Sequence, residues 1–266
     1  MVSYITDNKA AWEEAFEHRR PDWGEKNHVR LMQEESLSFF EPDVREILSQ
    51  IDFSDKTVAQ FCCNNGRELL SLVKSGAKSG FGFDIAENII EQARRTAAQA
   101  SIDNCTFVAC DILEIPQEYH NRFDFALFTL GAITWFEDLT LLFESVAKCM
   151  KDEGLLLIND FHPFFNMLAL PTDDCFDSEN LNKLAFSYFK KEPWIETSGM
   201  DYMTDVYESK PFVSFSHTLS AIINALLANH VMVTRLDEYD YDIGLTDIYD
   251  HRGLPLSFTL VAKKNA

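Results

Sequence analysis

Two neighbouring stretches of the chain decide its fold. The first is Thr57–Glu68, TVAQFCCNNGRE, and the second is Gly80–Ile85, GFGFDI. In the first, a short apolar run meets a turn of small polar residues and a helix follows; the second run ends in the acid Asp84. This order predicts a strand–helix–strand unit that binds a nucleoside. The turn brings backbone N–H groups close to a ligand, and the acid can accept both ribose hydroxyls.

The turn departs from the usual dinucleotide pattern. Asp84 lies 18 residues after Gly66 (84 − 66 = 18), close to the roughly 20 expected for a ribose-binding acid. Gly-x-Gly-x-x-Gly is absent, however, because Cys62 and Asn64 carry side chains in the turn. Side chains limit the approach of the backbone to a ligand, which argues against a bound pyrophosphate. Asn tolerates the left-handed region, so Asn64 can still form the turn.

Composition narrows the possible partners. The 266 residues include 46% hydrophobic residues, enough for one large α/β domain or two small ones. The 22 Phe predict an aromatic interior or an aromatic-lined cavity. The formal charge of −20 disfavours nucleic acid and membrane surfaces as partners, since both are anionic.

The cellular compartment is expected to be the cytoplasm. Met1–Asp7 does not resemble a signal peptide, and no apolar run approaches the length of a membrane span. The six Cys show neither a disulfide framework nor zinc spacing, so we expect reduced thiols. The acids 237–242 fit a solvated face better than a cation site, and no ligands in register accompany Asp160; we expect no metal.

Strands and helices alternate along most of the chain. The strands are near-continuous apolar runs, as in a parallel sheet covered on both faces. Asn8 is the expected cap of the first helix, and Pro42 opens the second. Residues 163–215 show no clean period and predict an inserted lid. Strands are expected at 58–61, 80–83, 106–109, 123–130, 155–159, 231–237 and 256–262, and helices at 8–20, 42–50, 68–75, 87–100, 139–150 and 216–229.

Three further stretches complete a recognisable series. They are Val108–Ile112, VACDI; Phe123–Leu127, FDFAL; and Lys151–Ile158, KDEGLLLI. With the two stretches above, they resemble five ordered motifs of the class I S-adenosylmethionine-dependent methyltransferases, especially the small-molecule branch. The first family motif usually reads acid-x-Gly-x-Gly-x-Gly. Here Gln60 takes the place of the acid, Cys62 and Asn64 take the places of the first two glycines, and Gly66 matches the third.

The resemblance implies a fold and a division of the chain. It covers 55–162 well and the C-terminal helix and strands more loosely. It implies a Rossmann-like α/β fold: a seven-stranded, mostly parallel sheet whose last strand is antiparallel, helices on both faces and a lid insertion. We expect a single methyltransferase domain over 1–266, with an N-terminal helical lid at 1–50, a cofactor-binding core at 55–162, a cap at 163–215 and a C-terminal helix and strands at 216–266.

The resemblance also implies a cofactor, S-adenosylmethionine, with S-adenosylhomocysteine as product. Asp84 matches the acid that binds the ribose, and Asp111 matches the acid that meets the adenine amino group. The alternatives are structural: Asp84 as a cap of helix 87–100 and Asp111 as a turn acid. The expected cofactor-binding residues are Gln60, Phe61, Cys62, Asn64, Gly66, Asp84, Ile85, Asp111, Ile112, Thr129 and Leu130.

Methyl transfer from a sulfonium is an in-line displacement, so the protein mainly aligns the reactants and excludes water, and adds a base where the acceptor carries a proton. His162 is the candidate base, because imidazole titrates near neutrality, and Trp135 is the candidate stacking residue. Either residue could instead be structural.

The predicted function is methyl transfer to a small-molecule acceptor, which the motifs do not identify; nor do they give the oligomeric state. Two alternatives remain. Gln60, Cys62 and Asn64 favour an inactive methyltransferase-like module that binds a nucleoside or regulates. The strand–helix–strand unit and Asp84 alone would also suit an NAD(P)-dependent oxidoreductase.

Overall fold

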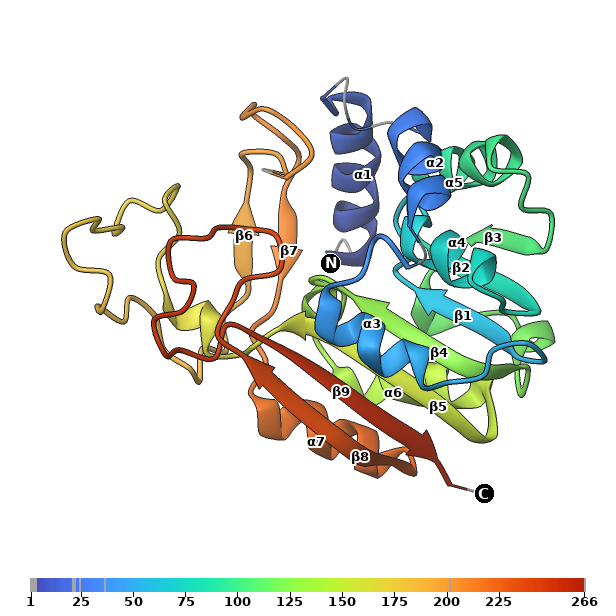
Figure 1. Ribbon diagram of the computed structural model, residues 1–266. Coiled ribbons are helices and arrows are strands. Elements are labelled where there is room, and N and C mark those ends of the chain that lie inside the picture. Colours follow the sequence, from blue (N-terminus) through green and yellow to red (C-terminus); the bar gives the residue numbers. More distant parts are fainter. Residues whose placement is uncertain (1–3, 21–22, 24, 36, 201, 266) are drawn as a thin grey trace.

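The computed structural model describes residues 4–20, 23, 25–35, 37–200 and 202–265. Its centre is a seven-stranded sheet in the order β3-β2-β1-β4-β5-β9-β8 (Figure 1). β9 runs antiparallel to both of its neighbours, and β3, β2, β1, β4 and β5 pair in parallel. The predicted Rossmann-like methyltransferase fold is therefore confirmed. The strands are β1 (Thr57–Phe61), β2 (Ser79–Asp84), β3 (Cys105–Ala109), β4 (Phe123–Thr129), β5 (Met150–Phe161), β8 (Val231–Tyr239) and β9 (Ser257–Lys264).

Helices cover both faces of the sheet, as the apolar strands require. Along β4, Phe125 and Leu127 pack into the core on one face, and Ala126 and Phe128 into the core on the other. The first core is closed by α3 (Pro42–Ser49), α4 (Arg67–Lys74) and α5 (Glu87–Gln99), and the second by α6 (Leu139–Cys149) and α7 (Leu219–Ala228).

Aromatic stacking stiffens the second core. Phe61 is fully buried, and its ring stacks between Phe83 and Phe128 with both ring centroids 5.5 Å away. Each buried Phe contributes roughly 1.5–3 kcal/mol of transfer free energy, and stacked pairs add about 1 kcal/mol. The carboxyl end of β1, where the site lies, is therefore held on a rigid base.

The largest differences between the observed and the expected element boundaries, at β5 and at the first helix, have physical reasons. β5 begins at Met150 rather than 155, because 151–154 forms an irregularity inside the strand instead of a turn before it; Glu153 there has a φ of 65°. The first helix, α1, is Tyr4–Glu17, so Asn8 lies inside it and does not cap it. Its side chain is instead buried and bonded across the structure to Val213.

Several elements have no counterpart in the sequence expectation. α2 (Glu25–Glu34) follows α1, and the segment 163–215 contains a two-stranded hairpin, β6 (Trp194–Glu196) with β7 (Phe212–Ser214). Short 3-10 turns occupy Ile112–Glu114, Gln117–Tyr119, Ile133–Trp135 and Phe165–Met167.

α1 and the β6–β7 hairpin, together called the cover, lie side by side over the carboxyl ends of the central strands (Figure 1). Asn8 Nδ2 donates to Val213 O at 2.8 Å, and Val213 N donates to Asn8 Oδ1 at 2.7 Å. Trp12 sets its ring edge-on to Phe212 with centroids 5.6 Å apart. Expected lid or cap residues 1–3, 21–22, 24, 36 and 201 lie outside the described residues.

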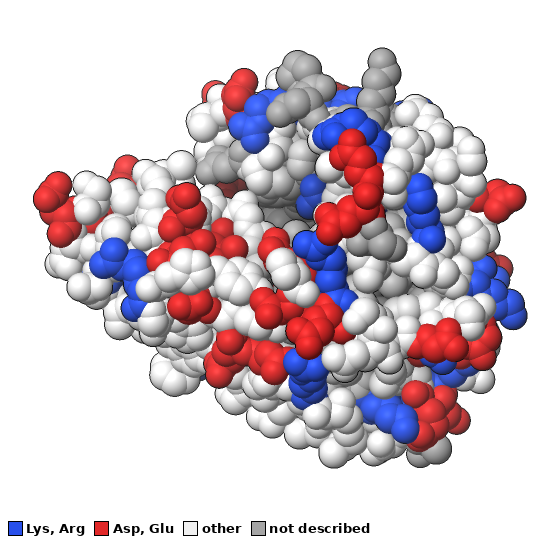
Figure 2. Space-filling model, viewed as in Figure 1, with Lys and Arg blue, Asp and Glu red and all other residues white. Residues whose placement is uncertain are grey.

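The surface carries the acidity of the composition. Acidic side chains gather over the lobe at the left of Figure 2 and around the C-terminal strands. All six cysteines are free. Within the described residues, no helix has the length and apolar character needed to cross a membrane.

Candidate active site

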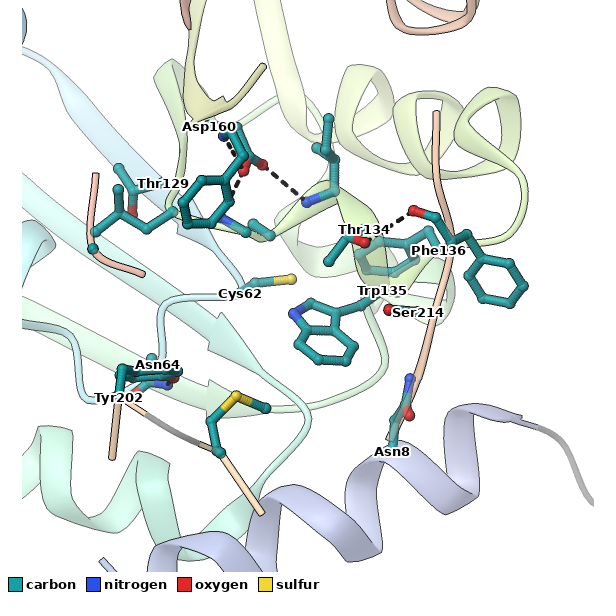
Figure 3. A pocket seen from close by; sticks show the side chains of 18 of the residues that line it. Asn8, Cys62, Asn64, Thr129, Thr134, Trp135, Phe136, Asp160, Tyr202 and Ser214 are labelled. Atoms are coloured by element: carbon teal, nitrogen blue, oxygen red, sulfur yellow. Dashed lines mark hydrogen bonds between the residues drawn. The ribbon is translucent and has the colours of Figure 1, made fainter. Parts of the chain in front are cut away.

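A cavity of about 400 Å³ opens at the carboxyl ends of β1, β2, β4 and β5, beneath the cover. Parallel α/β sheets bind ligands at this edge. The walls combine loops of the sheet with aromatic side chains of the cover (Figure 3). Of the predicted site residues, this cavity is lined by Gln60, Cys62, Asn64, Asp84, Ile85, Asp111, Ile112, Thr129, Leu130 and Trp135; Phe61, Gly66 and His162 are not among its lining residues.

The β1–α4 loop has the backbone of a glycine motif although it keeps only one of the three glycines. Cys62, Asn64 and Gly66, the three positions matched to the family glycines, all have left-handed φ values of 54°, 48° and 74°. A side chain in this region is strained by about 1–2 kcal/mol, somewhat less for Asn. The loop keeps this shape because tertiary contacts on both sides hold it.

One such contact comes from Asp84 at the end of β2. Its Oδ2 accepts the Asn64 N–H at 2.8 Å, and its Oδ1 accepts the Ala86 N–H at 3.1 Å. The side chain lines the cavity, and the backbone N–H bonds do not use all of the lone pairs of the two oxygens. Burial raises the pKa of Asp84, opposed by these hydrogen bonds. The carboxylate therefore both fixes the loop and can accept hydroxyls from a ligand.

Gly66 is required for packing beneath the loop. A Cβ built on Gly66 would lie 2.4 Å from the Phe107 ring, so only glycine fits there. Phe61 is likewise a core residue, and both support the loop from below.

Gln60 acts as an internal link. Its Nε2 donates to Thr129 Oγ1 at 2.9 Å and its Oε1 accepts the Leu69 N–H at 3.1 Å, which joins β1, β4 and α4. The side chain is only 1% exposed. Its amide is thus engaged at both ends, and cofactor contact by Gln60 stays a prediction.

The adenine end predicted from the sequence lies on the same wall. Asp111 Oδ1 accepts the Leu113 N–H at 2.9 Å and so caps the short turn that begins at Ile112. Burial raises the pKa of Asp111. Its second oxygen has no hydrogen bond among the described residues and is the part of the group that a ligand can use.

Asp160 is the buried acid at the far side of the cavity. Its carboxylate accepts N–H bonds from Gly131 at 2.6 Å, Phe161 at 2.8 Å and Ile133 at 3.3 Å (Figure 3). Burial raises the pKa of Asp160 to about 6, against the effect of these donors. The group holds the Leu130–Trp135 loop, where Leu130 has a left-handed φ of 47°.

Trp135 leaves this loop and enters the centre of the cavity (Figure 3). Its ring meets Trp12 edge-on with centroids 5.4 Å apart, and Phe212 at 6.1 Å. Phe215 N donates to Thr134 O at 2.8 Å, and Thr134 Oγ1 donates to Phe215 O at 2.9 Å. The loop of β4 and the cover thus form one aromatic wall, and stacking by Trp135 stays a prediction.

His162 turns away from this space. Its Nδ1 accepts the Phe164 N–H at 3.0 Å, and its Nε2 lies 2.9 Å from Glu238 Oε1 without the alignment of a hydrogen bond. Burial lowers the pKa of His162, and Glu238 opposes this. A role as base stays a prediction, which this placement does not favour.

His217 is the imidazole that lines the cavity. Its Nε2 lies 2.9 Å from Phe136 O, so the proton is assigned to Nε2 and Nδ1 is left as an acceptor. Burial lowers the pKa of His217, which keeps the ring neutral at pH 7.

The cavity is aromatic and acidic, with one strong cation. Among its described lining residues Arg67 is the only Lys or Arg, against six carboxylates. Burial and nearby acids raise the pKa of the Cys62 thiol, so it remains protonated. The described residues bring no three metal-ligating side chains together. The six acids are Glu68, Asp84, Asp111, Asp160, Asp173 and Glu196.

Comparison with known proteins identifies the family of this chain. A family model described as a methyltransferase domain matches residues 52–207, more than half of the chain. The chain therefore belongs to the methyltransferase-domain family, which confirms the resemblance seen in its motifs. No curated protein matches the sequence.

Solved structures agree on the fold. A Listeria monocytogenes protein described as an S-adenosylmethionine-dependent methyltransferase has a TM-score of 0.63 at 19% identity, covering 83% of this chain and 97% of that one. An S-adenosylmethionine-dependent methyltransferase of Mesorhizobium loti has a TM-score of 0.57 at 17% identity, with coverage of 84% and 96%. Magnesium protoporphyrin IX methyltransferase of Synechocystis PCC 6803, solved with bound SAH, has a TM-score of 0.52 at 14% identity, with coverage of 90% and 86%.

Sequence reasoning missed three residues of the site. By sequence, Asp160 is a candidate only for a metal ligand, although its position at the end of a central strand points to the sheet's ligand edge. Arg67 follows the turn glycine directly, and its charge was a usable signal. Nothing local indicated that Asn8 bonds to Val213, because 205 residues separate them.

Proposed function

We propose that this protein is an S-adenosylmethionine-dependent methyltransferase that acts on a small, uncharged or cationic acceptor with an apolar body. The observation that carries the proposal is the contact between Asp84 and the β1–α4 loop. An acid that accepts the Asn64 N–H faces the cavity directly beside three left-handed loop residues. Membership of the methyltransferase-domain family supports the same reading.

The residues present fit the nucleoside part of this cofactor. Asp84 has lone pairs for the ribose hydroxyls, and Asp111 has an oxygen for the adenine amino group. Asn65 lines the cavity, is 1% exposed, and its Nδ2 has no hydrogen-bond partner among the described residues. A buried donor of this kind calls for a ligand acceptor or a water molecule.

When bound, the cofactor would supply an electrophilic methyl group on a sulfonium. The chain would then align the acceptor and keep water out, tasks suited to the aromatic wall of Trp12 and Trp135. His217 is the candidate proton acceptor, because its side chain lines the cavity and its neutral ring, bonded through Nε2, leaves Nδ1 as an acceptor.

The acceptor class follows from the charges. Apart from Arg67, the described lining holds no Lys or Arg, and it holds Asp160, Asp173 and Glu196 in addition to the two acids assigned to the nucleoside. Phosphorylated or carboxylate acceptors would meet repulsion there, whereas a neutral or cationic ring can stack on aromatic faces.

Calorimetric titration tests the proposal. S-adenosylmethionine, S-adenosylhomocysteine and NAD⁺ are each titrated into the protein and into Asp84→Asn. We expect micromolar binding of the first two and none of NAD⁺, and a loss of about 10–100-fold in Asp84→Asn. Asp103→Asn, an exposed acid after α5, is the control and should bind normally.

Binding of NAD⁺ alone would replace the proposal with an oxidoreductase. Binding of S-adenosylhomocysteine without turnover on any amine or phenol offered would favour the inactive module.

A further inference from the structure

A cationic and an anionic side chain, those of Arg67 and Glu68, lie next to each other at the start of α4, an arrangement that complements the carboxylate and ammonium of an amino acid. Arg67 and Glu68 both line the cavity. Arg67 Nε donates to Glu68 Oε1 at 2.8 Å, and the Glu68 side chain is only 6% exposed. This positive and negative pair is held in one fixed geometry beside the β1–α4 loop.

The pair has unused hydrogen-bonding capacity. The two Nη groups of Arg67 make no hydrogen bond within the described residues, and neither does Glu68 Oε2. Asn65, directly before Gly66, contributes the unpartnered Nδ2 described above. These are donors suited to a carboxylate and an acceptor suited to an ammonium.

Packing fixes the direction of the guanidinium. Arg67 Cζ lies 5.8 Å from the Trp23 ring centroid and 5.6 Å from that of Phe39, so two aromatic rings flank it. Stacked, ion-paired Arg loses little conformational freedom when it binds a carboxylate with its planar fork.

The position at which family members carry an acid does not offer one here. Both ends of the Gln60 amide are hydrogen-bonded, to Thr129 and to Leu69. A bound S-adenosylmethionine therefore needs another partner for its charged α-amino and carboxylate groups. Because Asp84 is hydrogen-bonded to Asn64, a nucleoside on Asp84 lies next to the loop that leads into Arg67 and Glu68.

We propose that Arg67, with Asn65, binds the carboxylate of the cofactor's methionine part, and that Glu68 binds its ammonium, in place of the acid missing at position 60. This assignment rests on the proposed cofactor. It makes the amino-acid tail, rather than the nucleoside alone, a major determinant of affinity.

Two ligands separate the tail from the nucleoside. S-adenosylhomocysteine carries the amino-acid tail, and 5′-methylthioadenosine has the same nucleoside and thioether without it. We expect Arg67→Gln to weaken S-adenosylhomocysteine by about 30-fold, and Glu68→Gln by about 10-fold, since each removes a charge-assisted contact. Binding of 5′-methylthioadenosine should change by less than about two-fold, because neither variant touches the nucleoside contacts.

Two further variants complete the experiment. Arg67→Lys keeps the charge without the fork and should lose about five-fold for S-adenosylhomocysteine. Arg67→Lys also keeps a cation beside the buried Glu68, so the test does not depend on Arg67→Gln, in which Glu68 loses its charged partner. Lys74→Gln, an exposed cation at the other end of α4, should bind both ligands normally.

Unchanged S-adenosylhomocysteine affinity in Arg67→Gln, or an equal loss for both ligands in a folded variant, would overturn the assignment while leaving the cofactor proposal intact. Failure of the unaltered protein to bind either ligand would instead overturn the cofactor proposal and this assignment with it. Thermal unfolding of each variant shows that it is folded.

Discussion

The two walls of the cavity are built in different ways. On the sheet side, loop residues are held by carboxylates that accept backbone N–H groups, as Asp84 does for Asn64 and Asp160 does for Gly131. On the cover side, aromatic rings meet edge-on, as Trp12 does with Trp135. Hydrogen bonds require a narrow range of distances and angles, whereas edge-on ring pairs are favourable over centroid separations of about 4.5–7 Å. The sheet wall is suited to holding one constant ligand, and the cover to adjusting to an acceptor.

The sheet wall should be the less tolerant of the two. Gly66→Ala places a Cβ 2.4 Å from the Phe107 ring at a left-handed φ of 74°. We expect a loss of about 3–4 kcal/mol in the free energy of unfolding, measured by urea denaturation. Gly76→Ala is the matched control, because its φ is also positive, at 122°, but nothing lies within 4 Å of the new Cβ. Equal losses would mean that backbone strain alone explains the effect.

The main polar tie of the cover gives a smaller effect. Asn8→Ala removes both hydrogen bonds to Val213 and leaves a partly buried N–H and C=O unpaired. We expect a loss of about 2 kcal/mol in unfolding free energy, together with weaker acceptor binding. Asn224→Ala, an exposed residue of α7, is the control. A stability loss without any change in acceptor binding would show that the cover is not part of the acceptor site.

Asp160 allows the sheet wall to be tested by pH. Burial raises its pKa to about 6 in the folded protein, above its ordinary value of 3.8. The folded state therefore binds the proton more tightly, so the contribution of this group to stability is complete below about pH 4 and declines as pH rises through 6.

Asp160→Asn cannot titrate. Compared with this variant, the unaltered protein should lose about 2 kcal/mol of unfolding free energy between about pH 4 and pH 7. Urea denaturation of both proteins across this pH range measures the loss. A difference between the two proteins that does not vary with pH would show that Asp160 is not buried as described.

The smallest effect is expected at Cys62, a loop residue on the sheet side of the cavity (Figure 3). Cys62→Gly removes a side chain from a left-handed position with φ 54° and from the cavity surface. We expect unfolding free energy to change by less than about 1 kcal/mol, because relieved strain is offset by a more flexible unfolded chain. S-adenosylhomocysteine should bind a few-fold more tightly in calorimetry. Cys62→Ala keeps the strained Cβ and should show no gain; a gain there would point to the thiol instead.

The difference between the sheet wall and the cover also explains which features can be predicted from the sequence. The loop at Cys62, Asn64 and Gly66 and the acid Asp84 lie within one strand–helix–strand unit, so local pattern and spacing place them. The positive φ at all three loop positions follows from the family motif even though two of the glycines are replaced.

The cover depends on distant partners. β6 and β7 are short, their strands lack an apolar period, and β7 packs against α1 and the Ile133–Trp135 turn, both far away in the sequence. Asn8 looks like a helix cap when only its neighbours in sequence are considered. Its actual role depends on Val213, and no local rule carries that information.

The Asn8–Val213 tie also sets an order of assembly during synthesis. The strands β1 to β5 can pair once residue 161 has been made, but α1 has no hairpin to pack against until residues 212–214 follow. β9, which inserts between β5 and β8, comes later still. In a chain made from its N-terminus, α1 can therefore pack on α5 first, and it gains its remaining contacts only when the hairpin that covers the cavity has been made.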